Sequence, residues 1–220
     1  MIVDSRLRKT HTVMLGSTSG TSYQVPGIDV ATRAILTIGY EHHEIHAGSS
    51  YTAHFDNTTA LSDDDVTAIG FTTPNSPKWL HIVAQATASS PAEFFILEAP
   101  TYLVSKGNHI TIFNRDRNSS KTSKAISLGD DAPLAATVGL ATTYIEAEWN
   151  AATIASGTVI DHILLAGGEG PKAAGGSSRG SQEWILKSNT AYFFYLQNIG
   201  ANTNLHEIHL DWYEHTNKAV

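Results

Sequence analysis

The sequence predicts an all-β protein: a β-sandwich or jelly-roll-like single domain preceded by an extended N-terminal arm. Three observations lead to this prediction. Many short segments alternate apolar and polar residues, turn-forming residues separate these segments, and no long stretch has helical periodicity. A chain of 220 residues that is 41% hydrophobic can bury one substantial core. We therefore expect an arm at residues 1–33 and the sandwich at residues 34–220.

The arm is expected because residues 16–22 are small and polar, and because Pro26 and Gly27 form a turn signal. Such a stretch buries too little apolar surface to become ordered by itself. Two interpretations remain open. The arm is either a frayed terminus or a segment that orders against a neighbouring subunit.

Alternation with a period of two residues begins at residue 34, where Ala34, Leu36, Ile38 and Tyr40 would share one face of a strand. Further strands are expected at residues 50–55, 67–73, 79–87, 93–97, 109–114, 143–149, 158–165, 183–187, 191–197 and 205–215. Turns are expected between them at residues 57–59, 62–65, 74–77, 89–91 and 106–108. Short strands at this spacing are typical of sandwiches and jelly rolls.

Two segments depart from this pattern. Residues 133–142 are compatible with one or two helical turns. Residues 167–181 are rich in glycine and have Arg179 as their main charged anchor, but they lack the G-x-x-x-x-G-K-[ST] pattern of a phosphate loop. We expect a loop there, either mobile or ordered by contacts in an assembly.

Composition argues against several classes of function. The chain has 14 basic and 21 acidic residues and a net charge of -7, which disfavours nucleic-acid binding, since that depends on clustered Lys and Arg. There are no cysteines, which excludes disulfides and thiolate metal sites. No apolar run is long enough to span a membrane, and the first residues do not resemble a signal peptide, so synthesis in a host cytoplasm is expected.

Histidines form the most distinctive pattern, with 11 in the chain. The tetrapeptide His-Glu-Ile-His occurs at residues 43–46 and again at residues 206–209. If both segments are strands, we expect them to lie close together. On the first strand His42, Glu44 and His46 would share a face, and on the last strand His206, Ile208, Leu210 and Trp212 would form the apolar face.

Three interpretations of the histidines remain open. His42, Glu44 and His46 are candidate ligands for a divalent metal. Alternatively, the histidines form a pH-sensitive interface network, or they are partly buried polar residues with satisfied hydrogen bonds. The interface candidates are His43, His46, Arg179, His206 and His209.

No catalytic template fits the chain. The zinc-protease motif H-E-x-x-H, the nucleophile elbow G-x-S-x-G and a cysteine nucleophile are all missing from the sequence. We therefore expect no enzymatic activity and no cofactor. A metal-dependent enzyme built on the histidine segments is the weakest of the functional hypotheses.

Five sequence blocks resemble a family of tailed-bacteriophage virion structural proteins of the capsid decoration (cement) or head-fibre type. They occur in the family's order at residues 40–52 (YEHHEIHAGSSYT), 113–120 (FNRDRNSS), 175–180 (GGSSRG), 183–187 (EWILK) and 210–216 (LDWYEHT). The arm lies outside this pattern. The resemblance supplies no catalytic residues to transfer to this chain.

The resemblance implies a decoration protein on the outer surface of a phage head, with the major capsid protein as its partner. Because capsid lattices offer positions where three subunits meet, we expect a homo-oligomer, and a trimer in particular. The alternative is a receptor- or carbohydrate-binding domain of a tail fibre or spike, which would be favoured by exposed aromatic residues. Trp79, Trp184 and Trp212 all lie in expected strands, where packing in the core is the simpler expectation.

Overall fold

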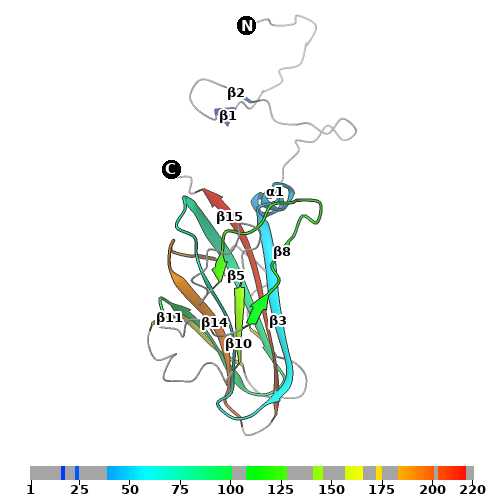
Figure 1. Cartoon of the computed structure of the whole chain (residues 1–220), viewed down its shortest axis with the longest axis vertical. Coiled ribbons are helices and arrows are strands. Elements are labelled where there is room, and N and C mark those ends of the chain that lie inside the picture. Colours follow the sequence, from blue (N-terminus) through cyan, green and yellow to red (C-terminus); the bar gives the residue numbers. More distant parts are fainter. Residues whose placement is uncertain are drawn as a thin grey trace, which may run out of the picture. The chain divides into compact units, whose positions relative to one another are not determined.

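The computed structural model describes residues 16–17, 23–24, 39–100, 108–127, 141–145, 157–165, 172–174, 183–200 and 203–216. The chain divides into two compact units, Met1–His42 and His43–Val220. In the first unit, β1 (Gly16–Ser17) pairs antiparallel with β2 (Tyr23–Gln24). The second unit confirms the predicted β-sandwich (Figure 1). The expected boundary after residue 33 lies outside the described residues.

One sheet of the sandwich, called here the β14 sheet, has the strand order β11-β6-β14-β4-β10-β7, and β9 pairs with β4 beside this path. All of its pairings are antiparallel. Its strands are β4 (Val66–Thr72), β6 (Ala92–Glu98), β7 (Asn108–Ile110), β9 (Ile126–Ser127), β10 (Ala141–Ile145), β11 (Thr158–Leu165) and β14 (Ala191–Asn198).

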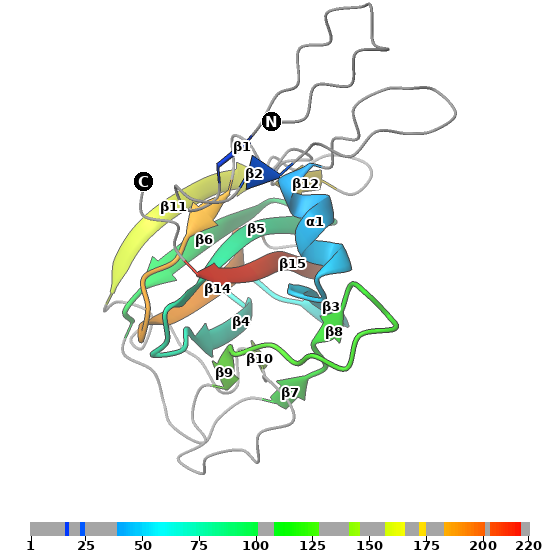
Figure 2. The same cartoon turned by 90° about the horizontal axis from the view of Figure 1, so that it is seen from above.

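The other sheet, called the β15 sheet, has the order β12-β5-β15-β3-β8, and β13 also pairs with β5. Its strands are β3 (Ser50–Leu61), β5 (Lys78–Ala88), β8 (Phe113–Asn114), β12 (Lys172–Ala174), β13 (Trp184–Ile185) and β15 (Asn204–Thr216). The last strand in sequence, β15, therefore lies between β3 and β5, and Figure 2 shows it crossing the middle of its sheet.

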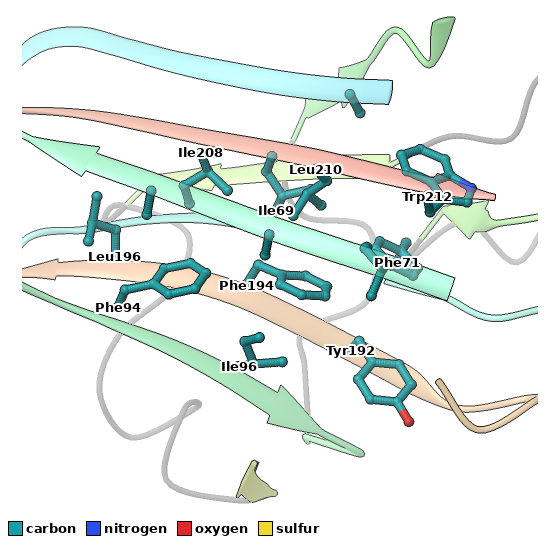
Figure 3. Close-up of a cluster of buried hydrophobic side chains, with 14 of the residues drawn as sticks. Ile69, Phe71, Phe94, Ile96, Tyr192, Phe194, Leu196, Ile208, Leu210 and Trp212 are labelled. Atoms are coloured by element: carbon teal, nitrogen blue, oxygen red, sulfur yellow. The ribbon is translucent and has the colours of Figure 1, made fainter. Parts of the chain in front are cut away.

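The core lies between the two sheets, where alternate residues of each strand point inward (Figure 3). From β15 these are Ile208, Leu210 and Trp212, as the alternation predicted. The ring of Phe71 packs against Phe194 and Trp212, with centroid distances of 5.7 and 6.3 Å. Truncating a buried Phe or Trp to Ala costs about 3–5 kcal/mol, so these rings dominate the stability of the sandwich.

The segment at residues 41–46 corrects the sequence prediction, because it forms the helix α1 (Tyr40–His46) and not the end of a strand. The helix ends in a Schellman motif: the Gly48 amide donates to the Ile45 carbonyl and the Ser49 amide donates to the Glu44 carbonyl, both within 2.9 Å. Gly48 has a φ of 65°, the left-handed conformation that this motif requires. The backbone carbonyls at the end of the helix are thereby satisfied before β3 begins.

Other boundaries also differ from prediction. The turn expected at residues 57–59 is part of β3, and the strand expected at residues 109–114 is divided between β7 and β8. Residues 141–142, expected to be helical or irregular, belong to β10, while β12 lies within the expected loop at residues 167–181. The strand expected at residues 34–40 lies outside the described residues up to residue 38, and its expected last residue, Tyr40, begins α1 instead. In the part of the chain that the structure describes, no helix is long and apolar enough to cross a membrane.

Candidate functional site: a histidine-rich sheet face

The outward face of the β15 sheet carries most of the sandwich's distinctive polar side chains. Along β15 the inward residues are buried, and the residues between them point away from the core. Strand register places the same face of β3 and β5 on either side. We call this surface the histidine face and define it by His54, His81, Glu183, Glu207, His209, Asp211, Tyr213 and His215.

The middle of the histidine face is built around His209. Its Nε2 lies 2.9 Å from the Thr52 hydroxyl and 3.4 Å from Asp211 Oδ1. The ring of His54, directly opposite on β3, stacks on His209 with a centroid distance of 5.9 Å. The hydrogen bond with Asp211 raises the pKa of His209, although partial burial and the positive charge of Arg115 act in the opposite direction.

Asp211 is the carboxylate partner in this group. Burial would raise its pKa, but the hydrogen bonds with His209 and Thr52, together with the charges of His209 and Arg115, hold the pKa below its usual value. The two shifts describe one interaction in which a protonated imidazole faces an ionised carboxylate. The imidazole of this pair therefore keeps its positive charge to a higher pH than an isolated histidine would.

A second group lies further along β15, around His81. Its Nδ1 is 2.8 Å from Glu183 Oε1, and the Tyr213 hydroxyl donates to the same oxygen at 2.7 Å. The His81 ring packs against both Tyr213 and His215, with centroid distances of 4.7 and 4.5 Å, and the rings of Tyr213 and His215 lie 5.8 Å apart. One carboxylate thus organises an imidazole and a phenol on the same sheet surface.

The metal candidates on α1 do not share a face. Residues two positions apart lie on opposite sides of a helix, so Glu44 points away from His42 and His46. Glu44 is buried and His46 is exposed. The His43 Nδ1 lies 3.4 Å from Glu44 Oε1. Among the described residues, no three His, Asp or Glu side chains are grouped in a way that could hold a metal ion.

The two His-Glu-Ile-His segments do not meet. The first lies in α1, just before Ser50, which pairs with Tyr213. The second lies near the beginning of β15, where His206 pairs with Asn57. The seven residue-to-residue steps from position 206 to position 213 span roughly 23 Å of extended strand. The expectation that both were neighbouring strands was wrong because the first segment is helical.

His206 lies in the interior of the sandwich, only 2% exposed. Its Nδ1 is 3.2 Å from the Thr67 hydroxyl, and Thr67 also accepts a hydrogen bond from the Asn57 amide at 3.2 Å. Burial lowers the pKa of His206 to about 4, although the charge of Asp65 acts in the opposite direction. At neutral pH this imidazole is therefore uncharged and forms part of the core, out of reach of a partner.

Of the interface candidates, His209 is therefore on the histidine face, His43 and His46 are exposed on α1, and His206 is interior. Arg179 lies outside the described residues. Sequence reasoning missed His54, His81 and Glu183, which are isolated along the chain. The alternation of Thr52, His54 and Asp56 was a usable signal for one shared face, but the pairing with His209 was not visible in the sequence.

The blocks at residues 40–52, 113–120 and 210–216 converge in space, and the block at residues 183–187 touches the last of them through the hydrogen bond from the Tyr213 hydroxyl to Glu183. The Asn114 amide donates to the Gly48 carbonyl at 3.0 Å. The Arg115 and Glu214 amides donate to the carbonyls of Ser50 and Ser49, both at 2.9 Å. These contacts hold the end of α1, the loop after β8 and the end of β15 together at one end of the β15 sheet (Figure 1).

A buried carboxylate, Glu214, anchors this junction. It is 2% exposed and accepts hydrogen bonds from the Ser123 hydroxyl at 2.6 Å, the Lys124 amide at 2.9 Å and the Trp212 indole at 3.3 Å. Burial raises its pKa, while these hydrogen bonds act in the opposite direction. Its role is to fix residues 123–125 against β15.

Fold and surface together define an antiparallel β-sandwich that presents a histidine-rich sheet face beside a rigid helix–loop junction. Comparison with protein-family models, with curated proteins and with solved structures found no match.

Proposed function

We propose that this protein is a non-enzymatic structural protein of a bacteriophage virion, a decoration protein that binds the outer surface of the head through its histidine face. The observation that carries the proposal is the composition of this face. None of the described outward residues of β3, β5 and β15 is a lysine, and imidazole, phenol and paired carboxylate groups occupy the central positions.

Such a face differs from an ordinary solvated sheet surface. Protein interfaces are enriched in aromatic side chains and depleted in lysine, because lysine is costly to immobilise and desolvate. On the histidine face, Glu183 and Asp211 already have partners within the chain. A protein partner can therefore cover these two carboxylates without burying an unpaired charge.

The resemblance of the five sequence blocks to virion proteins supplies the partner class, namely the major capsid protein. Three of these blocks meet at the junction next to the histidine face, and a fourth contributes Glu183 to the face itself, which supports a shared framework for presenting that face. A homo-oligomer remains part of the proposal. A trimer is the form that three-fold lattice positions favour, since each copy then repeats the same contact.

The test uses heads of the encoding phage assembled without this protein. Purified chain should co-sediment with these heads, and the double variant His54→Glu/His209→Glu, which introduces charge on the face, should bind at least roughly tenfold more weakly. The double variant Asn75→Glu/Ser188→Glu, at exposed positions in the turns before β5 and after β13, adds the same two carboxylates elsewhere and should bind as the wild type does. No binding by the wild type, or equal loss in both variants, would overturn the proposal.

One observation favours the receptor- or carbohydrate-binding alternative. Trp79 is only partly buried and lies opposite His215, on the outward side of β5 next to Tyr213. Aromatic faces of this kind can stack on sugar rings. Glycan-array binding that is lost in Trp79→Ala, combined with density at the tail tip in cryo-EM images of the particle, would replace the decoration proposal with this one.

The non-enzymatic part of the proposal is tested separately. Purified protein should give no turnover with generic esterase, phosphatase, glycosidase and peptidase substrates. Turnover that disappears in His81→Ala, where the His81–Glu183 pair is broken, would show that the histidine face has a chemical role.

A further inference from the structure

The edge strand β11 exposes apolar side chains to an unusual degree for a sandwich edge. Leu164 is 62% exposed and Val159 is 52% exposed. Both lie opposite outward residues of β6, Glu93 and Leu97, so they occupy the same outer face of the β14 sheet.

The backbone of β11 has one side that no described strand pairs with. The strand stands at the end of the β14 sheet and pairs with β6 alone among the described strands (Figures 1 and 2). Natural edge strands are protected by lysine, proline, bulges or short length. β11 has eight residues and contains neither lysine nor proline, and its one bulge lies between Val159 and Asp161. Within the stretch from Asp161 to Leu165, Asp161 Oδ1 accepts a hydrogen bond from the His162 amide at 2.9 Å, and pairing with another strand must displace this exposed contact.

A rigid aromatic ladder supports this edge. The ring of His162 stacks on Phe95 with a centroid distance of 4.2 Å and an interplanar angle of 3°, and Phe95 stacks on Tyr195 at 4.6 Å. His162 Nε2 also lies 3.7 Å from Glu93 Oε1. These contacts across β11, β6 and β14 hold the outer side of the edge in a defined geometry.

We propose that β11 pairs antiparallel with β11 of a second copy of this chain, which joins two β14 sheets edge to edge. The pairing uses the regular stretch after the bulge. In the proposed register, Ile163 of one copy lies opposite Ile163 of the other, and the five residues from Asp161 to Leu165 of each copy are paired. Leu164 then lies opposite His162 of the other copy, and both side chains are on the outer face.

This register fits the chemistry of the strand. Residues directly opposite in an antiparallel pair share a face, and like charges opposite one another are destabilising. A pairing centred on Asp161 or His162 would oppose identical ionisable groups, whereas one centred on Ile163 opposes Ile163 with itself and covers Leu164. In this register the strand is complementary to itself, so a second copy of the chain can occupy the edge. The contact goes beyond the proposed function and does not require a capsid.

The first test measures mass in solution by analytical ultracentrifugation. Leu164→Lys places a charge next to the centre of the contact, opposite His162 of the other copy, and should halve the mass of the assembly. Ile185→Lys is the matched control, since Ile185 is 55% exposed but lies on β13 in the β15 sheet, and it should leave the mass unchanged. A wild type that is monomeric throughout the accessible concentration range, or that aggregates without a defined size, would overturn the proposal.

The second test does not depend on weakening the contact. Because the chain has no cysteine, a single introduced thiol reports its own surroundings. Ile163→Cys lies on the proposed two-fold axis, where paired residues are within disulfide range, and should form a covalent dimer under mild oxidation. Val159→Cys, on the same strand but far from the Val159 position of the other copy in this register, should remain monomeric after the same oxidation, as read on a non-reducing gel. Equal cross-linking of the two cysteine variants would contradict the specific pairing. If Leu164→Lys still binds capsids, the contact between β11 strands is distinct from capsid binding through the histidine face.

Discussion

His206 Nδ1 lies 3.2 Å from the Thr67 hydroxyl in the interior of the sandwich, while its Nε2 is buried without a hydrogen-bond partner among the described residues. The imidazole is therefore held neutral between the sheets. Burial disfavours the charged form of the ring and so lowers its pKa, and a proton gained at Nε2 would find no acceptor among the described residues.

This relationship predicts acid sensitivity. The folded-state pKa of about 4 lies below the unfolded value near 6.5, so the contribution of His206 is fully present above pH 6.5 and is lost as the pH falls towards 4. The loss amounts to about 3 kcal/mol. Urea unfolding between pH 4 and 7.5 should show a smaller acid-induced loss in His206→Gln than in the wild type. Parallel pH curves for the two proteins would contradict this role.

Glu214 should be important for the junction. Glu214→Ala leaves the Ser123, Lys124 and Trp212 donors without their acceptor, and we expect a loss of roughly 2–4 kcal/mol in the free energy of unfolding. Glu214→Gln retains one acceptor oxygen and removes a buried charge, so it should cost less. Urea unfolding at pH 7 measures both. The prediction fails if the two variants are equally destabilised.

Gly48 should not tolerate a side chain. Its φ is 65°, and a Cβ atom would lie 2.2 Å from Ser119 Oγ. Gly48→Ala should therefore lose more than the ~1 kcal/mol of a left-handed alanine, because Ser119 must also move. Gly39→Ala is the control, since a Cβ there meets nothing within 4 Å. Thermal unfolding should show a clear loss for Gly48→Ala alone.

The His209–Asp211 pair should be visible in a titration. The folded-state pKa of His209 is raised, so its contribution to stability is present below the unfolded pKa and is lost as the pH rises through the folded one. In Asp211→Asn the pKa of His209 should fall, because the main interaction that raises it is removed. NMR titration of the His209 ring protons measures this directly, and an unchanged midpoint would refute the pairing.

Much of the fold was predictable where local pattern and burial agree. The alternation in residues 205–215 identified the inward face of β15 correctly, since a central strand with one buried face must alternate. The α1 helix was missed because its seven residues make only about two turns, too few to show a repeating apolar face. The Gly48 signal two residues beyond His46 was present, but it is short and local.

The remaining errors have tertiary causes. Asn57 is a turn-forming residue by propensity, yet it lies within β3 because its side-chain amide donates to Thr67 inside the sandwich. His81 and Glu183 meet only because β13 pairs with β5. Such partners are separated by about half the chain, so no local pattern could reveal the histidine face as a group.

The position of β15 has a consequence for how the protein is made. Both of its neighbours, β3 and β5, are synthesised long before it, and until residues 204–216 leave the ribosome the β15 sheet has a gap at its centre. Pairings between segments so distant in sequence form slowly. The nascent chain must therefore keep two apolar strand surfaces from aggregating until translation reaches Trp212. Premature termination before residue 204 would yield a substrate for chaperones and proteases, and not a weakened sandwich.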